Sequence, residues 1–294
     1  DGATEITLLG QNVNSYGRDL TLSLRNEPPA TGDADAAGPM WAGDNRRRPR
    51  PLFADLLRAV GDVPGIRRVR YTSPHPKDIR PDVMEAMADT PAVCEHLHLP
   101  LQSGSDSVLS AMHRGYTAQR YVERLEQARA IVPDLAVTTD IIVGFPGETE
   151  HDFEQTLSVA ADAEYDGAYT FVFSPREGTE AARMVDRFCD PAEVVDRYER
   201  LRAVIRRSGA RRHEARVGRV EEVVVEGPSK RDPQVVTGRT RQNKLIHFPA
   251  ESPLRVGTYA NVEVVAARTH YLLGEFVEVV APARHKTRIP VVAG

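Results

Sequence analysis

The 294-residue chain carries 38 basic and 42 acidic side chains, which gives a formal net charge of −4. This balance argues against a wholly basic nucleic-acid coat protein, although it leaves room for one basic face. Hydrophobic residues make up 41% of the chain, enough to build a core, and the length predicts about two domains. Because no apolar run of about 18 residues occurs, we expect no membrane-spanning helix.

Cysteine is rare, with only Cys94 and Cys189 in the sequence. Two thiols exclude a disulfide scaffold and any multi-cysteine zinc or iron–sulfur site built within the chain. We therefore expect a reducing, cytoplasmic setting. The sequence opens at Asp1, without Met and directly before a predicted strand, so we expect it to be a fragment of a longer enzyme.

Strand-like and helix-like segments alternate over the first two thirds of the chain. The predicted strands are 6–9, 66–71, 96–100, 136–145 and 169–173, and the predicted helices are 51–60, 81–88, 105–112, 118–131 and 151–163. Strands separated by helices indicate a parallel sheet with right-handed crossovers. We therefore predict an α/β fold, a partial TIM-type (β/α) barrel, over residues 1–212.

Two segments interrupt this alternation. Residues 23–50 are rich in Pro, Gly, Ala, Asp and Asn and cannot bury enough apolar surface to offset their chain entropy, so we expect a disordered insertion. Its arginine cluster at 46–50 is either solvated or in contact with RNA. Residues 191–216 predict a long, basic linking helix. Its arginines either form a solvated surface paired with Glu199 and Glu214 or contact phosphates.

Short alternating segments follow this helix, at 220–226, 234–237, 244–248, 259–267 and 272–280, with Gly and Pro turns between them. A small antiparallel β-barrel is the economical arrangement for such strands. We assign it to residues 213–282 and expect a loose tail at 283–294. Its loops are expected to carry Lys230, Arg231, Arg239, Arg241 and Lys244.

Polar side chains gather where the predicted parallel strands end, the edge at which α/β barrels place their active sites. Amides follow the first strand, and hydroxyls and a carboxylate, which are groups that hydrogen-bond ribose, follow the third. The same residues can instead cap a turn or a helix. The candidates are Gln11, Asn12, Gln102, Ser103, Ser105, Asp106, Asp140, Ile142, Gly144, Ser174 and Arg176. We predict that they converge on one nucleoside-shaped pocket.

A histidine pair on the third strand allows a different chemistry. His96 and His98 face the same side of the strand, and an H-x-H pair in a barrel can bind a metal, as in metal-dependent hydrolases. Such a site needs further ligands from other strands, for which Asp140 and His75 are available.

Taken in order, the strand ends resemble the MiaB-type tRNA methylthiotransferases, which are radical S-adenosylmethionine (SAM) enzymes. The runs that carry the resemblance are LLGQNVNSYG, HLHLPLQSGSDSVLSAMHRGYT, DIIVGFPGETEHDF and FVFSPREGTEAARM, and GRTRQNKLIHF resembles the TRAM domain that closes the same proteins. The resemblance covers nearly the whole chain except residues 23–50 and the tail. It implies a radical SAM barrel followed by an RNA-binding TRAM barrel.

The chain departs from this family in its cysteines. The family carries a CxxxCxxC triad and an N-terminal domain with three more cysteines, and neither is present here. The resemblance therefore implies a barrel that lacks its first strand. It also implies that the two [4Fe–4S] clusters of the full-length parent are not held by this chain, which we expect to contain no catalytic residue or metal ligand and to be inactive alone.

The GQNVN run is closest to the branch that acts on N6-isopentenyladenosine beside the anticodon. The resemblance implies that the parent uses SAM to transfer a methylthio group to C2 of this nucleoside at position 37, forming 2-methylthio-N6-dimethylallyladenosine. The alternatives are a methylthiotransferase acting on threonylcarbamoyladenosine in tRNA, a non-catalytic RNA-binding fragment and the metal-dependent hydrolase. The implied partners of this monomer are a tRNA anticodon stem-loop and a reducing electron donor, with no membrane.

Residue roles follow by position in the motifs. Gln11 and Asn12 would lie near the methionine end of SAM or the substrate, and Ser174 and Arg176 would line the rim. The ribose region would be served by Gln102, Ser103, Ser105 and Asp106, and the adenine side by Ile142, Val143 and Gly144. His75, His96 and His98 would be polar residues inside the barrel. The implied phosphate contacts are Arg206, Arg212, Lys230, Arg231, Arg239, Arg241 and Lys244. Phe248 or Tyr259 either stacks on an unpaired base or is buried.

Overall fold

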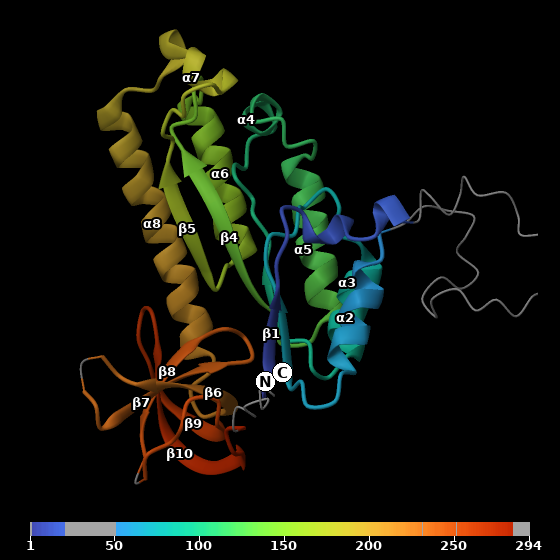
Figure 1. Cartoon of the computed structure of the whole chain (residues 1–294). Coiled ribbons are helices and arrows are strands. Elements are labelled where there is room, and N and C mark those ends of the chain that lie inside the picture. Colours follow the sequence, from blue (N-terminus) through green and yellow to red (C-terminus); the bar gives the residue numbers. More distant parts are fainter. Residues whose placement is uncertain (1, 21–50, 231, 251, 285–294) are drawn as a thin grey trace, which may run out of the picture.

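The computed structural model describes residues 2–20, 51–230, 232–250 and 252–284. The predicted insertion at 23–50, Arg231 and most of the predicted tail lie outside these residues. The described chain forms a parallel α/β unit with a closed β-barrel at one end (Figure 1).

The parallel strands occur in chain order, as the sequence predicts. Strand β1 (Glu5–Leu8) pairs with β2 (Arg68–Tyr71), and β3 (His96–His98) pairs with β4 (Ala136–Val143), which pairs with β5 (Gly167–Val172); every one of these pairs is parallel. A parallel bridge between Val69 and Val93 connects β2 to the segment just before β3. In the order β3-β4-β5, strand β5 lies at one edge of its sheet.

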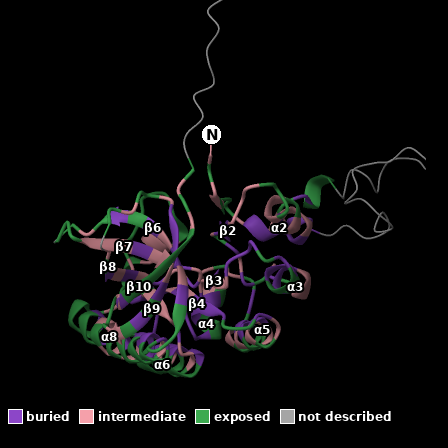
Figure 2. Ribbon diagram, turned by 90° about the horizontal axis from the view of Figure 1, so that it is seen from below, coloured by how far each residue is buried: buried purple, intermediate pink, exposed green. Residues whose placement is uncertain are grey.

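Helices cover one face of these strands (Figure 2). They are α2 (Phe53–Gly61), α3 (Pro81–Asp89), α4 (Asp106–Ala111), α5 (Ala118–Ile131), α6 (Glu150–Ala163) and α8 (Pro191–Glu214). Leu97, Val137 and Ile141 point toward the helices and are fully buried. Because side chains alternate along a strand, His98, Thr138 and Asp140 face the other way, onto a face that no helix of the described residues covers.

Three short elements were not predicted: η1 (Val13–Ser15), α7 (Glu180–Arg183) and η4 (Val185–Arg187). Each has at most four residues, too few for a hydrophobic period to show in sequence. No helix within the described residues has both the length and the apolar character needed to cross a membrane.

The barrel consists of β6 (Val220–Pro228), β7 (Val235–Thr240), β8 (Leu245–Pro249), β9 (Tyr259–Ala267) and β10 (Leu272–Ala281), closed in the order β10-β8-β7-β6-β9. Neighbours pair antiparallel except β8 and β10, which close the barrel as a parallel pair. The expectation of a wholly antiparallel barrel is therefore wrong at this closure. Val223, Ile246, Phe248 and Val262 form a core distinct from that of the α/β unit.

The barrel packs against the N-terminal edge of the parallel strands. Acidic residues that lie just before β3, β4 and β5 each bind a basic residue near the barrel: Glu95 binds Arg241 at 2.6 Å, Asp134 binds Arg216 at 2.6 Å, and Asp166 binds Lys244 at 2.5 Å. The barrel thus occupies the N-terminal edge, and the C-terminal edge of the strands, where the candidate residues lie, stays open.

Candidate functional site

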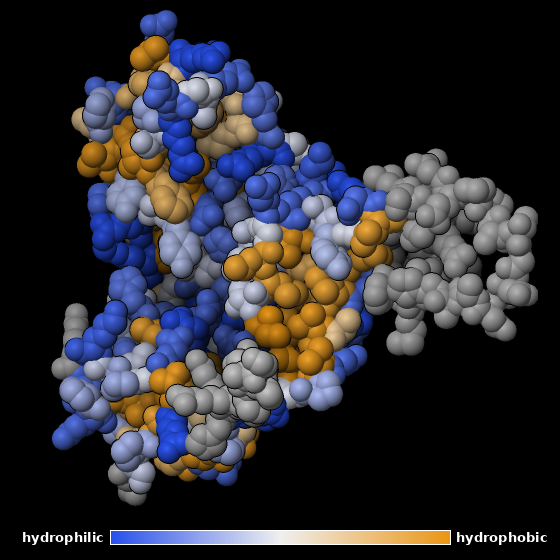
Figure 3. Space-filling view, viewed as in Figure 1, coloured by the Kyte–Doolittle hydropathy of each residue, from blue (hydrophilic) through white to orange (hydrophobic). Residues whose placement is uncertain are grey.

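A cavity of about 600 Å³ lies at the C-terminal edge of the strands. Of the predicted site residues, Gln102, Asp140, Ile142, Ser174 and Arg176 line it. Figure 3 shows the molecule hollowed in front of the sheet, above the barrel. Five of the eleven candidate residues therefore share one cavity, and their binding of a nucleoside stays a prediction.

Backbone geometry after β3 places Gln102 in this cavity. Its φ is +68°, in the left-handed region. The Gln102 N–H donates to the Asp140 carbonyl at 2.8 Å, and the Ile142 N–H donates to the Gln102 carbonyl at 2.9 Å. The chain therefore runs alongside the end of β4, so that the Gln102 amide, the Asp140 carboxylate and the Ile142 side chain line the same space.

A chain of polar contacts extends from the cavity along the open face of the sheet. Asp140 Oδ2 lies 3.3 Å from His98 Nε2, and Thr138 Oγ1 lies 2.9 Å from His98 Nδ1 and 3.1 Å from His96 Nε2. Burial lowers the pKa of His96 to about 3, so this ring is neutral at pH 7. The Tyr169 ring contacts His98 edge to face, at 6.1 Å between centroids.

These contacts bear on the metal alternative. The point on which the two histidine rings converge is occupied by the Thr138 hydroxyl, which lies within hydrogen-bond distance of both. Among the residues that the structure describes, no three His, Cys, Asp or Glu side chains are grouped so as to hold a metal ion. The geometry therefore gives the metal-dependent hydrolase no support.

The serine-rich segment after β3 is used for helix capping. Ser105 is the N-cap of α4, where its side chain accepts from the Val108 N–H, and it donates to Asp152 at 2.5 Å. Ser103 is fully buried beside Thr156, and Asp106 accepts from the Ala118 N–H at 2.7 Å. These side chains do not line the cavity, so their ribose role stays a prediction.

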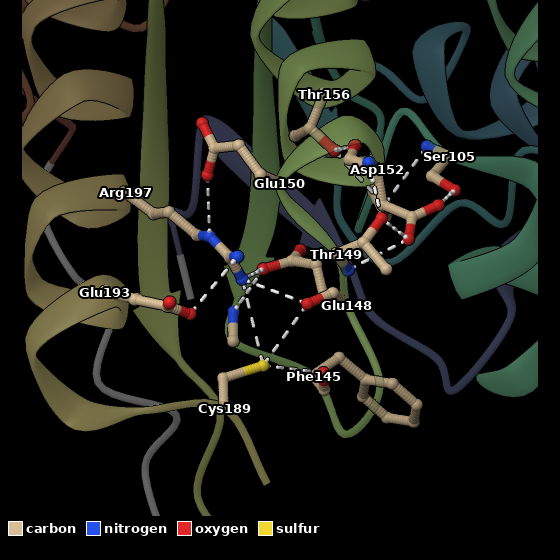
Figure 4. A network of polar contacts seen from close by, with 12 residues as sticks. Ser105, Phe145, Glu148, Thr149, Glu150, Asp152, Thr156, Cys189, Glu193 and Arg197 are labelled. Carbon is tan, nitrogen blue, oxygen red and sulfur yellow. Dashed lines mark hydrogen bonds and ion pairs between the residues drawn. The ribbon is translucent and has the colours of Figure 1, made fainter. Parts of the chain in front are cut away.

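A buried ion pair fixes the loop after β4 (Figure 4). Glu148 Oε2 accepts from the Gly144 N–H at 2.8 Å and lies 3.2 Å from Arg197 Nη1 on α8. Although Arg197 opposes the effect, burial raises the pKa of Glu148 above its usual range. Gly144 has a φ of +73°, and a Cβ there would lie 2.7 Å from Val194 Cγ2. Glycine is therefore needed at 144 for the close approach of α8.

The tip of β1 lies outside the lining of the cavity. Asn12 Nδ2 donates to Asp78 at 2.6 Å, and Gln11 is exposed. The amide nitrogen and oxygen of Asn14 are buried without a hydrogen-bond partner among the described residues. His75 accepts from the Lys77 N–H at 3.2 Å, which gives it a structural role in the turn after β2.

The predicted RNA-contact residues occupy different environments. Arg241 and Lys244 lie between the barrel and the sheet, and Arg239 lies within β7, not in a loop, and binds Glu226 at 2.6 Å. Arg212 donates to the Glu164 carbonyl at 3.0 Å, whereas Arg206 has no ion-pair partner within the described chain. The RNA role of this set stays a prediction, and Arg206 is the member whose placement suits it best.

The structure also shows cavity residues that the sequence analysis did not single out, notably Arg114, Phe145 and Phe171. Arg114 lies in the run MHRGYT and Phe171 in FVFSPR, both within segments used for the resemblance. The strand pattern over 169–173 could have indicated Phe171, because every second side chain of a strand points away from the helix-covered face.

Family models match two parts of the chain: the Radical SAM superfamily over residues 35–160 and the TRAM domain over residues 214–277. The tRNA-2-methylthio-N(6)-dimethylallyladenosine synthase 1 of Mycobacterium marinum is 45% identical, over 93% of this chain and 50% of its own. The corresponding synthase of Alkaliphilus oremlandii is 43% identical, over 95% of this chain and 53% of its own. The chain is thus similar to the MiaB-type tRNA methylthiotransferases over nearly its whole length. It spans about half the length of the curated relatives it matches.

Solved structures resemble this methylthiotransferase homologue more loosely. Coproporphyrinogen III oxidase from Escherichia coli, a radical SAM enzyme, superposes with a TM-score of 0.43 at 16% identity, over 71% of this chain and 50% of that one. A likeness of this size carries no argument about the site. The α/β unit with an appended barrel agrees with the family matches, which place the Radical SAM match before the TRAM match.

Proposed function

We propose that the protein to which these residues belong transfers a methylthio group to C2 of N6-isopentenyladenosine in tRNA by radical SAM chemistry. The observation that carries this proposal is the cavity at the C-terminal strand edge in a chain 45% identical to a tRNA-2-methylthio-N(6)-dimethylallyladenosine synthase. The GQNVN run supports the isopentenyladenosine branch over the threonylcarbamoyladenosine branch.

The cavity residues suit a nucleoside with a charged amino-acid end. Gln102 and Asp140 offer an amide and a carboxylate to hydroxyl groups, and Ile142 offers an apolar surface to a purine ring. Arg176 has no ion-pair partner among the described residues, so its guanidinium is free to bind a carboxylate. We propose that these residues bind SAM, which together with an iron–sulfur cluster supplies the radical chemistry when bound.

The other predicted cofactor residues take indirect roles in this proposal. Ser105 and Asp152 hold the start of α4 against α6, and Glu148 with Arg197 holds the Gly144 loop. Both sets keep the loops after β3 and β4 rigid, and therefore keep Gln102 and Ile142 in place. Asn14, with its unpaired buried amide, and the neighbouring Asn12 fit a polar group brought to the tip of β1.

The finer architecture belongs to the same proposal. The parallel strands β1–β5 with helices on one face support a partial TIM-type barrel over residues 1–212, followed by a TRAM-like barrel over 213–282. We further propose that the clusters require cysteines beyond Cys94 and Cys189, since a [4Fe–4S] cluster needs more thiolate ligands than two. The tRNA anticodon stem-loop, an electron donor and a cytoplasmic setting complete the proposal.

Nucleoside analysis of tRNA tests the activity. The complete reading frame that encodes these residues is expressed in cells that make N6-isopentenyladenosine but not its methylthio derivative. We expect 2-methylthio-N6-dimethylallyladenosine to appear in hydrolysed tRNA, and the variant Asp140→Ala to abolish it. A methylthio derivative of threonylcarbamoyladenosine would instead support the other branch, and unchanged tRNA would overturn the proposal.

A further inference from the structure

Strand β5 presents two aromatic rings to solvent on the open face of the sheet. Tyr169 is 65% exposed and Phe171 is 50% exposed. Tyr169 pairs with Asp140 and Phe171 pairs with Ile142 in the β4–β5 register, so both rings stand beside the side chains that line the cavity. Large rings are usually buried, and an exposed pair next to a polar cavity indicates a surface that packs against a partner.

A second, smaller cavity of about 200 Å³ lies on the other side of the same strand. Its lining includes Thr170 of β5, Arg202 and Arg206 of α8, and His270 of the turn between β9 and β10. Arg202 is bound to Glu199 at 2.9 Å, whereas Arg206 has no acidic partner among the described residues. This second cavity therefore offers an unpaired guanidinium on the opposite side of β5 from the exposed rings.

Because β5 is an edge strand, nothing in the sheet separates the two surfaces. One side of the strand offers aromatic rings, and the side reached around its free edge offers positive charge. Proteins that bind single-stranded nucleic acid combine these two features, with rings that stack on bases and a positive groove that follows the phosphates. The charge favours a nucleic acid over a segment of this protein or a second copy of the chain.

We propose that β5 is the binding site for an unpaired RNA nucleotide, with its base stacked on Phe171 and Tyr169 and a neighbouring phosphate at Arg206. This inference rests on the proposed tRNA function and deepens it by naming the residues that hold the nucleotide beside the cavity. Of the two outcomes left open for Phe248 and Tyr259, the structure has the second: both rings are buried and offer no stacking surface. A stacked base at Phe171 would lie next to the cavity wall at Ile142 and Asp140.

The stacking is tested with Phe171→Leu and Phe171→Tyr in the full chain. Leu keeps an apolar side chain without a π-face, and Tyr keeps the ring. The ligand is a short RNA hairpin with 2-aminopurine in its loop, whose fluorescence is quenched by stacking and whose binding is followed separately by anisotropy. We expect Phe171→Leu to weaken binding by about 5-fold to 100-fold and to reduce the quenching, and Phe171→Tyr to retain both. Urea unfolding checks that each variant is folded.

The phosphate contact is tested with Arg206→Gln against Arg207→Gln. Arg207 is an exposed neighbour on α8 that does not line the second cavity, so its replacement removes the same charge from a different place. We expect Arg206→Gln to reduce the slope of log affinity against log salt by about 0.7, and Arg207→Gln to leave the slope nearly unchanged.

The outcomes separate this inference from the proposed function. Equal binding and quenching by the unaltered chain and Phe171→Leu would overturn the stacking, and equal slopes for the two arginine variants would overturn the phosphate contact. Either result, obtained with a chain that still binds the hairpin, leaves the tRNA function standing. Failure of the unaltered chain to bind the hairpin would overturn this inference, whereas unchanged tRNA in the nucleoside analysis is the result that overturns the proposed function.

Discussion

Lys244 provides the sharpest test of how the barrel is attached to the sheet. Its ammonium lies 2.5 Å from Asp166 Oδ1, and both side chains are more than nine-tenths buried. Burial lowers the pKa of Lys244, and Asp166 opposes that effect. Lys244→Met keeps the shape of the side chain and removes the charge, so the Asp166 carboxylate is left buried without its partner. Breaking a buried pair in this way costs about 3–5 kcal/mol of unfolding free energy.

A double-mutant cycle isolates the interaction between the two charges. In the unaltered protein the Val137 N–H donates to Asp166 Oδ2 at 2.8 Å. Asp166→Asn removes the negative charge but keeps an oxygen that can accept this hydrogen bond. We expect the double variant to be more stable than the sum of the two single losses predicts, by about 2 kcal/mol or more, because neither charge is then left alone. Urea unfolding followed by far-UV circular dichroism measures all four proteins.

The same variant separates a structural lysine from an RNA-binding one. If Lys244 were on an exposed loop and contacted a phosphate, its replacement by Met would weaken RNA binding and reduce the salt dependence of that binding, with little change in stability. A destabilisation below about 1 kcal/mol by Lys244→Met, with weakened RNA binding, would refute the buried-pair argument. We expect the opposite: a large loss of stability and unchanged RNA affinity under conditions in which the variant is folded.

Two further predictions concern backbone and pH. Gly144→Ala should lower the free energy of unfolding by about 2–4 kcal/mol, because a Cβ there combines a positive φ with overlap against α8. At Gly147, φ is +86° and the space is open, so the control Gly147→Ala should lower it by only about 1 kcal/mol. Equal decreases in melting temperature for the two variants would exclude the overlap. Burial lowers the pKa of His213 to about 4 and that of His96 to about 3. Since the unfolded chain takes up these protons below about pH 6.5, stability should be complete above that pH and fall on acidification, by about 1.4 kcal/mol for His213 at pH 5.5. Urea unfolding at neutral pH and at pH 5.5 measures this loss of stability, which should be smaller in the variant His213→Asn. An equal loss in the variant would contradict its assignment to His213.

The secondary structure was predictable because each main element carries a long local signal. The run 136–145 is apolar enough to indicate a buried strand, and the structure has β4 at Ala136–Val143. The long basic helix begins at Pro191, as predicted, since Pro is favoured in the first turn. The parallel closure of the barrel by β8 and β10 was not predictable, because strand pairing depends on contacts between distant segments that periodicity does not encode.

The candidate site was predictable at the level of position and less so at the level of side-chain direction. Polar residues that follow parallel strands must lie at one edge of the sheet, and Gln102, Asp140 and Arg176 line one cavity there. Ser103 and Ser105 follow the same strand but point into the contact between α4 and α6, where they meet Thr156 and Asp152. Serine serves equally well as a helix cap and as a ligand for ribose, and the sequence does not distinguish the two uses.

The basic residues show most clearly what a sequence leaves undetermined. The charge of Arg241 and Lys244 is evident from the sequence, but their partners, Glu95 and Asp166, lie 146 and 78 residues away and precede strands of a different unit. Because these pairs hold the barrel on the N-terminal edge, the C-terminal edge with its larger cavity stays uncovered by the barrel. On the α8 side of β5, Arg206 borders the smaller cavity without an acidic partner in the described chain, and this is the guanidinium that we assign to a phosphate.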